Sequence, residues 1–311
     1  MWPSDKNALH AQTIMLSLPP TQKGVMAEQQ KMEIVLRKAR HEDREKAIEI
    51  ESKSTPNRRY VADVFDMFVS DEVGEFSVAE IDREVVACGK YTVVPDGSVW
   101  LETLRVIPER QGRGIGKRFY ERWLDIAHRQ GVRTMRMYTG IKNVVSRGLA
   151  ERYGLRLAET FRGAYLPCQL NTNQTSSNTF RLITNPKKAD SLLMPLKEKW
   201  RDFHVMNRTF LKFTPALFTD LVENGMIYQD PITHSVITLG ARFQPEQMLH
   251  IGLFEGDAEA CLEFAMQEGL KRGVNGLNCD FPVSAIEVQR TLTRYGFRLT
   301  SSDFIVMEIN L

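Results

Sequence analysis

Hydrophobic and polar positions in the first half of the chain follow two periods, one typical of helices and one typical of strands. Residues 40–52 place Ala47, Ile48 and Ile50 on one side of an amphipathic helix. Residues 61–69 predict a second helix, and apolar runs predict strands at residues 34–39, 75–81, 85–94 and 99–106. The turn Pro95-Asp-Gly97 is typical of a β-hairpin, so we expect antiparallel strands on either side of it.

The rest of the first half alternates between helix and strand. A glycine-rich loop leads into a helix over about residues 114–129, and a strand at 132–138, a helix at about 143–153 and a strand up to residue 170 follow. Residues 171–179 contain no apolar side chain and are interpreted as an interdomain linker. Residues 1–31 show no sustained period and are interpreted as a flexible leader.

The second half of the chain repeats the first. The run Arg152-Tyr-Gly-Leu-Arg-Leu157 recurs as Arg294-Tyr-Gly-Phe-Arg-Leu299, an offset of 142 residues, and the same offset places Gly131 on Gly273. Two matches at one offset predict a tandem duplication of one unit. We expect an α/β (α+β) fold in which each unit has a mixed, mostly antiparallel central sheet flanked by helices. The units are expected at residues 32–170 and 180–311.

The composition excludes several classes of function. A length of 311 residues favours two domains, and 42% hydrophobic with 26% charged residues is ordinary for a globular protein. The net charge is +2, and the basic residues gather around one loop instead of alternating with aromatic residues, which argues against nucleic acid. No apolar run is long enough for a membrane span. The four cysteines lack metal-ligand spacing, so we expect no metal and a cytoplasmic protein with reduced thiols.

The segment Arg110-Gln-Gly-Arg-Gly-Ile-Gly116 carries the clearest chemical signal. A glycine-rich turn between a strand and a helix exposes backbone N–H groups, and they converge with the positive end of the helix dipole. Arg110, Arg113, Lys117 and Arg118 add positive charge. The alternative is a tight turn whose glycines serve only packing, but the strand, the spacing and the basic residues together favour a diphosphate site.

This loop resembles the acetyl-coenzyme A signature of the GCN5-related N-acetyltransferases, or GNAT superfamily. The resemblance lies in Gln111-x-x-Gly114-x-Gly116 after a strand that ends Leu104-Arg-Val106-x-Pro108, and the order of elements over residues 33–170 agrees with it. A Rossmann site is excluded because antiparallel strands precede the loop. The resemblance implies that acetyl-CoA is the co-substrate and that the following residues bind it: Leu104, Val106, Gln111, Gly112, Arg113, Gly114, Ile115, Gly116, Lys117 and Asn143. Asn143 could equally be a helix N-cap.

The resemblance implies direct attack by a primary amine on the acetyl thioester, which requires a base. Glu102 is the candidate, because it lies nine residues before Gln111, where some family members place a base, and it shares a strand face with Trp100. The alternative is a carboxylate bound to Arg105 or facing solvent. The family's usual acid, a tyrosine, is replaced by Ala150; Tyr153 suits packing, so Tyr138 is the candidate acid, with Tyr165 or water as alternatives.

The acceptor is predicted from the loop between the first two helices. Arg58, Arg59 and Tyr60 lie there, and paired arginines suit a carboxylate, although a solvated basic loop is the alternative. We take these residues and Trp100 as the substrate-binding set. The runs Pro56-Asn-Arg-Arg-Tyr60 and Trp100-Leu-Glu-Thr-Leu-Arg-Val106 are similar to vertebrate histidine N-acetyltransferase and its relatives, which implies α-amino acetylation of a free amino acid, with histidine one candidate. A peptide or protein N-acetyltransferase and a non-catalytic acetyl-CoA sensor remain open.

The second unit is expected to lack the cofactor loop. At an offset of 142, residues 111–116 align with residues 253–258, where only one glycine remains. The charge balance of residues 105–136 is +6, whereas that of residues 247–278 is −3, so a diphosphate would be repelled there. This unit would then cover the active site, shape the acceptor pocket or support a homodimer.

Overall fold

The computed structural model describes residues 33–55, 59–168 and 179–311. The predicted leader and all but Thr179 of the predicted linker lie outside the described residues, and so does Arg58. None of the helices in the described ranges has an apolar stretch long enough to cross a membrane.

The first half contains the elements that its pattern predicts, in the predicted order. They are β1 (Val35–Lys38), η1 (His41–Asp43), α1 (Arg44–Ser54), α2 (Val61–Val69), β2 (Glu75–Ile81), β3 (Glu84–Val93), β4 (Val99–Val106), η2 (Pro108–Arg110), α3 (Ile115–Gln130), β5 (Thr134–Gly140), α4 (Val144–Arg152) and β6 (Arg156–Pro167). The predicted bounds of α2, β2 and β4 agree with the structure residue for residue.

The second half repeats this order and adds a hairpin. Its elements are β7 (Arg181–Leu182), α5 (Pro186–Leu193), η3 (Met194–Leu196), β8 (Phe203–Met206), β9 (Thr209–Lys212), α6 (Pro215–Glu223), β10 (Ile227–Gln229), β11 (Val236–Gly240), β12 (Met248–Glu255), α7 (Ala258–Arg272), β13 (Gly276–Pro282), α8 (Ile286–Tyr295), β14 (Arg298–Leu299) and β15 (Phe304–Asn310). The helices α3 and α7 end on Gly131 and Gly273, both left-handed, as the repeat requires.

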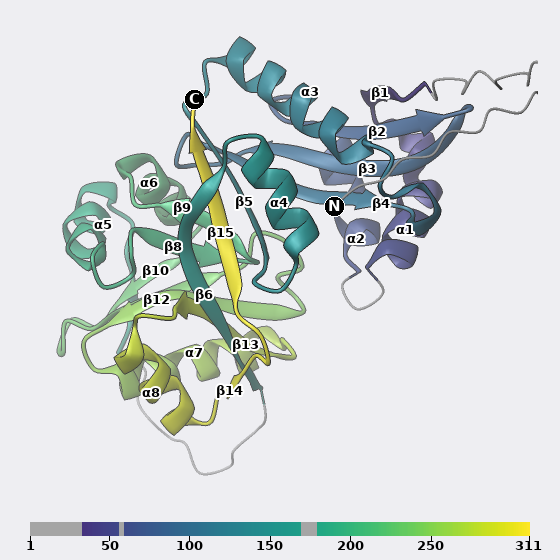
Figure 1. Cartoon of the computed structure of the whole chain (residues 1–311). Coiled ribbons are helices and arrows are strands. Elements are labelled where there is room, and N and C mark those ends of the chain that lie inside the picture. Colours follow the sequence, from purple (N-terminus) through teal and green to yellow (C-terminus); the bar gives the residue numbers. More distant parts are fainter. Residues whose placement is uncertain (1–32, 56–58, 169–178) are drawn as a thin grey trace, which may run out of the picture. The chain divides into compact units, whose positions relative to one another are not determined.

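One sheet runs through both halves, in the order β1-β2-β3-β4-β5-β15-β6-β13-β12-β11-β10-β7 (Figure 1). Its strands are antiparallel except for the pairs β4–β5 and β12–β13. The chain therefore has the predicted fold class: a mixed, mostly antiparallel sheet flanked by helices in two similar halves.

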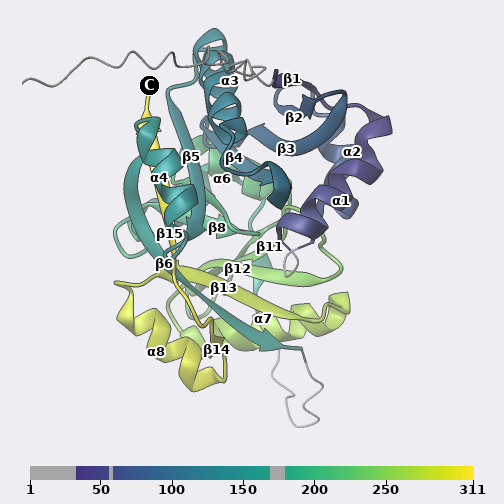
Figure 2. The same ribbon diagram turned by 45° about the vertical axis from the view of Figure 1, so that its right-hand side comes forward.

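The two halves exchange their last strands. β15, the C-terminal strand, lies between β5 and β6, and it pairs with β5 from Thr134↔Asn310 to Gly140↔Phe304. β6 pairs in turn with β13 from Gly276↔Pro167 onwards. Figures 1 and 2 show the yellow β15 beside the teal β5 and β6. The two copies of the 142-residue repeat thus each give their last strand to the sheet of the other copy. The predicted domain boundaries follow chain order and stay a prediction.

The hydrophobic core is shared as well. Phe210, in the hairpin β8–β9, packs at 4.7 Å from Phe161 of β6 and 5.8 Å from Phe304 of β15, measured between ring centroids. It also lies 5.6 Å from Trp100 of β4. Aromatic residues from both halves therefore meet where the strands are exchanged, which ties the stability of each half to the other.

Helices cover both faces of the first-half strands. Phe68 of α2 packs edge-on against Phe76 of β2, and Lys90 of β3 lies over the Phe68 ring. The preceding residue, Gly89, faces the opposite side, where a Cβ would come within 2.8 Å of Trp123 in α3. The helices α1 and α2 therefore lie on one face of these strands and α3 on the other.

Candidate functional site

The strands β4 and β5 separate partway along their length. They pair only over Val99–Leu101 and Met135–Met137, although β4 continues to Val106 and β5 to Gly140. The separation begins where the register of β3 against β4 shifts and Thr103 takes a positive φ of 59°. Such a bulge twists one strand away from its neighbour. Beyond Leu101 the edge of β4, with half-buried Leu104 and Val106, is left without β5 as a partner.

The glycine loop follows directly from this strand and is open. Gly112 and Gly114 have φ values of 75° and 84°, and a Cβ on either would meet no heavy atom within 4 Å. Positive φ explains the glycines, because L side chains are strained there. Gly114 is the N-cap of α3, and no side chain caps the helix. The first-turn amides and the helix dipole can therefore act on an anion, which fits the diphosphate of a nucleotide-like group.

Other residues of the predicted cofactor set have structural partners. The side-chain amide of Gln111 donates to the carbonyl oxygen of Val106 at 3.0 Å, which fastens the loop to the end of β4. A Cβ on Gly116 would come within 2.8 Å of Leu149, so this glycine allows α3 to pack on α4. Arg113 and Lys117 are exposed. Asn143 accepts a hydrogen bond from Ser146 N at 3.1 Å and is the N-cap of α4; its contact with a cofactor stays a prediction.

The loop of the second half differs more than the sequence alignment indicates. Residues 253–255 belong to the strand β12, and only Gly256 and Asp257 separate β12 from α7, whereas eight residues separate β4 from α3. The alignment of residues 111–116 with 253–258 is therefore wrong, because the second half lacks most of the loop. The carboxylate of Asp257 accepts from Ala260 N at 3.1 Å, so the N-terminus of α7 already holds an anion.

The strand separation in the second half is also filled. β12 and β13 pair only up to Ile251 and Cys279, and the register of β11 against β12 shifts beside Gly252. Buried His204 of β8 lies so close to Gly252 that a Cβ there would clash with its ring. His204 Nε2 is 3.0 Å from Thr238 Oγ1, and burial lowers the pKa of this histidine to about 3. A neutral imidazole therefore packs against β12 where this strand leaves β13.

Glu102 lies in a buried ion pair with the second half of the chain. Arg242, in the loop between β11 and β12, donates from Nη2 to Oε1 at 2.7 Å and from Nη1 to Oε2 at 2.9 Å. Thr92 Oγ1 donates to Oε1 at 2.5 Å, and Arg242 Nη1 also donates to Thr209 Oγ1 at 2.9 Å. The partner is therefore neither Arg105 nor solvent. The bidentate geometry fixes the carboxylate at the residue where β4 leaves β5.

The predicted substrate residues meet only in part. Tyr60 donates to or accepts from Thr103 Oγ1 at 2.7 Å, and burial, together with the charge of Glu102, raises the pKa of the Tyr60 hydroxyl. Trp100 stacks on Tyr138 with ring centroids 5.9 Å apart, but it is 1% exposed and forms a wall under Tyr138. Arg59 is exposed in the loop before α2. Tyr60, Glu102 and Tyr138 thus gather on the α1–α2 face, beside the strand separation.

Tyr60 is held from below by a residue that the sequence did not single out. Buried Glu51 accepts from Tyr60 N at 3.0 Å and from Val61 N at 2.9 Å, so it caps α2. Burial, opposed by these two amides, raises the pKa of Glu51. The cap fixes where the helix begins and therefore where the Tyr60 ring points.

The second half supplies side chains to this face that sequence reasoning missed. Phe243 stacks on Tyr60 with centroids 5.5 Å apart, and Gln244 Nε2 donates to Asp63 Oδ2 at 2.6 Å. With Arg242 they form a loop, residues 242–244, that closes over the α1–α2 side of the site. No local pattern marks these residues, since their partners lie about 140 to 180 positions earlier in the chain.

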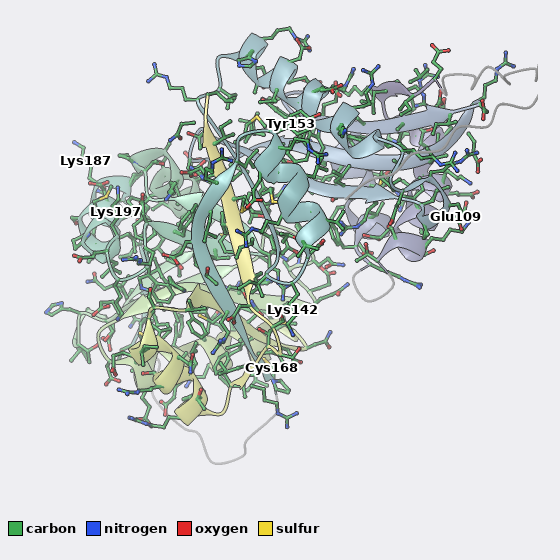
Figure 3. The ribbon with its side chains drawn as sticks, in the orientation of Figure 1. Glu109, Lys142, Tyr153, Cys168, Lys187 and Lys197 are labelled. Atoms are coloured by element: carbon green, nitrogen blue, oxygen red, sulfur yellow. The ribbon has the colours of Figure 1, made fainter. Side chains whose placement is uncertain are left out.

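Tyr153 is a packing residue, as its recurrence at Tyr295 predicts. Its ring stacks on Tyr120 of α3 at 5.1 Å between centroids, and its hydroxyl donates to Glu121 Oε1 at 3.2 Å. Figure 3 shows Tyr153 at the end of α4 that is near α3, whereas Lys142 marks the opposite end. Within the described ranges, no group of three or more His, Cys, Asp and Glu side chains is arranged to hold a metal.

Comparison with known proteins identifies the fold and the first domain. Residues 37–155 match the model of the Acetyltransferase (GNAT) family. The GCN5-related N-acetyltransferase from Sphaerobacter thermophilus superposes with a TM-score of 0.61 at 12% identity, over 89% of this chain and 95% of that chain. A tandem GNAT protein from the clavulanic acid biosynthesis pathway gives a TM-score of 0.55 at 12% identity, over 90% and 98%.

A further neighbour, the GCN5-related N-acetyltransferase from Kribbella flavida, superposes with a TM-score of 0.50 at 14% identity, over 90% of this chain and 72% of that chain. No curated protein sequence matches the chain. Identities this low establish the fold and not the substrate, but the superpositions cover both halves, so the second half shares the fold of the first.

Proposed function

We propose that this chain is an N-acetyltransferase that transfers the acetyl group of acetyl-CoA to the α-amino group of a free amino acid, since residues 37–155 match the model of the Acetyltransferase (GNAT) family. The open glycine loop carries the proposal. Three features follow one another along the chain: the edge of β4 that has no partner strand, the left-handed glycines and the uncapped first turn of α3. This order suits a long thioester that has a diphosphate at one end.

The residues of the site have separate roles in this proposal. Amides of residues 112–117 hold the diphosphate, and the β4 edge at Leu104–Val106 holds the pantetheine arm. The amine approaches from the α1–α2 face and loses a proton to Glu102, directly or through water. A bond then forms between the amine nitrogen and the acetyl carbon, the carbon–sulfur bond breaks, and the thiolate takes a proton from Tyr138 or from water.

A small acceptor fits this face better than a peptide. The stacked rings of Tyr60 and Phe243 and the contact between Gln244 and Asp63 close the side on which an extended chain would have to lie. A free amino acid needs no such groove. We place the enzyme in the cytoplasm, since Cys88, Cys168, Cys261 and Cys279 are all free thiols.

The test is a CoA-release screen over free amino acids, polyamines, short peptides and buffer alone, together with acetyl-CoA binding by calorimetry. We expect turnover with amino acids and one binding site per chain, because the second half has only Gly256 and Asp257 in place of the loop. Turnover confined to peptides would show that the acceptor is a peptide and not a free amino acid. Acetyl-CoA binding without turnover on any amine would favour a sensor.

A matched pair of variants isolates the loop. Gly114 and Gly131 cap the two ends of α3, both have positive φ, at 84° and 67°, and a Cβ on either meets open space. Gly114→Ala and Gly131→Ala therefore cost similar backbone strain, about 1 kcal/mol each. We expect only Gly114→Ala to weaken acetyl-CoA binding, by tenfold or more. Equal affinities of the two variants would contradict the assignment of the loop.

A further inference from the structure

The hairpin β8–β9 carries an arginine at its tip, and that arginine lies against Tyr138 of β5. Asn207 and Arg208 form the two-residue turn, with φ values of 46° and 57° that are typical of a type I′ turn. Asn207 fixes the tip, because its Oδ1 accepts from Arg242 N at 2.7 Å and its Nδ2 donates to the Phe243 carbonyl at 3.0 Å. Arg208 is therefore presented by a rigid turn.

The guanidinium of Arg208 lies over two aromatic rings beside the site. Its Cζ is 4.9 Å from the centroid of Phe304 and 6.0 Å from that of Tyr138. Tyr138 follows Met137, the last residue of β5 that pairs with β4. The positive charge from the second half is therefore within one side-chain length of the place where β4 and β5 part.

None of the ion pairs between the described residues includes Arg208, and its Nη1 is buried without a hydrogen-bond partner. Glu102, the acid of the same face, is held by Arg242 on both oxygens. The neighbouring His250 adds no second positive charge, because burial and the charge of Arg208 lower its pKa to about 4.

A buried donor without a partner weakens a fold, so its presence at a binding face points to a ligand that completes it. Planar guanidinium groups bind carboxylates in a two-point geometry, and aromatic walls below the group hold it flat. In an α-amino acid a single carbon separates the carboxylate from the reacting amine. A carboxylate on Arg208 would therefore leave the amine close to the strand separation.

We propose that Arg208 binds the carboxylate of the acceptor and thereby selects α-amino acids over amines that lack one. The proposal rests on the proposed acetyltransferase function and names the group that sets its substrate class. It moves carboxylate recognition from Arg58 and Arg59 of the α1–α2 loop to the hairpin of the second half. The second half, although without a cofactor loop, then contributes directly to specificity.

The experiment compares three acceptors that have the same side chain and differ only at the carboxylate. They are the best amino acid of the CoA-release screen, its carboxamide and the decarboxylated amine. The wild-type enzyme should prefer the amino acid. Arg208→Met should lower kcat/KM for the amino acid by about 10- to 150-fold, the range of a charge-assisted hydrogen bond. For the carboxamide and the amine, kcat/KM should change by less than about threefold, and the Kd of acetyl-CoA should not change.

Two controls separate recognition from folding. Arg201→Met removes an arginine that precedes β8 and pairs with Glu159 at 2.9 Å, and it should leave the acceptor preference unchanged. Arg208→Lys keeps the charge without the two-point geometry and should show an intermediate loss. The Tm of Arg208→Met should stay equal or rise, because an unpaired buried donor is removed.

The outcomes distinguish this proposal from the one on which it rests. Equal losses for all three acceptors, or no loss for the amino acid, would overturn the role of Arg208. A wild-type enzyme that prefers the amine or the carboxamide would overturn it even if Arg208→Met fails to fold, and acetyl transfer itself would stand. Absence of turnover with every amine would overturn both.

Discussion

The ion pair between Glu102 and Arg242 offers the sharpest test of how the two halves cooperate. It joins β4 to the loop between β11 and β12, and the two side chains are 6% and 21% exposed. Removing one partner of a buried pair typically costs about 3–5 kcal/mol, because the other charge remains in the interior. Arg242 is partly exposed, so we take the lower end and expect Arg242→Met to cost about 3 kcal/mol.

Glu102→Gln should cost less, about 1–2 kcal/mol. The amide keeps an acceptor for Arg242 and for Thr92, and the arginine that remains can reach water. In the double variant neither charge is buried alone, so the two losses should fall short of additivity by about 2 kcal/mol. Urea unfolding of the four proteins gives these values, and Arg242→Met should lower the Tm by about 6 °C.

Activity measurements on the same variants separate the two roles of Glu102. If it accepts the proton of the amine, Glu102→Gln should lower kcat by about 10²- to 10⁴-fold while the Kd of acetyl-CoA stays constant. Strictly additive stability losses would refute the coupling of the halves through this pair. An unchanged kcat and pH profile in Glu102→Gln would remove Glu102 from the mechanism and leave it a structural residue.

Two further predictions follow from the strand exchange and from the filled second half. A fragment of residues 33–168 should show no cooperative thermal transition by circular dichroism, since it lacks β15, which separates β5 from β6; a sharp transition would mean that the first half folds alone. His204 has a folded pKa of about 3 against 6.5 in the unfolded chain, so its contribution to stability is complete above pH 6.5 and is lost as the pH falls towards 3. Between pH 6.5 and 5 this loss of stability is about 2 kcal/mol. His204→Gln, which keeps an amide near Thr238, should remove this pH dependence. If the urea midpoints of the wild type and of His204→Gln depend on pH in the same way, this account is contradicted.

The sequence by itself determined the elements of the first half and the glycine loop after β4. Local rules suffice there: the bounds of α2 and β4 follow from apolar periodicity, and Gly112 and Gly114 are required by positive φ at the positions they occupy. The 142-residue repeat also predicted two similar halves, because a duplicated sequence must bury a duplicated apolar pattern. The glycine loop is visible in the sequence because its residues are contiguous.

Contacts between distant residues were decided only by the tertiary structure. An offset of 142 places the repeats in register at Gly131 and Gly273, but it could not show that the second half lacks most of a loop, because the length of β12 is set by pairing with β11 and β13. Nor could it show that β15 enters the sheet beside β5. Strand order depends on pairing across the whole chain, which no local pattern encodes.

The acceptor face shows the same division most clearly. Glu102 and Tyr60 stand out in the sequence because each lies in or beside a recognisable element. Arg242 and Arg208 do not, since each acquires its meaning only from the charge or the rings that the fold places next to it. A burial-dependent interaction is set by the surroundings of a side chain, and those surroundings come from residues that are more than 60 positions away in the chain.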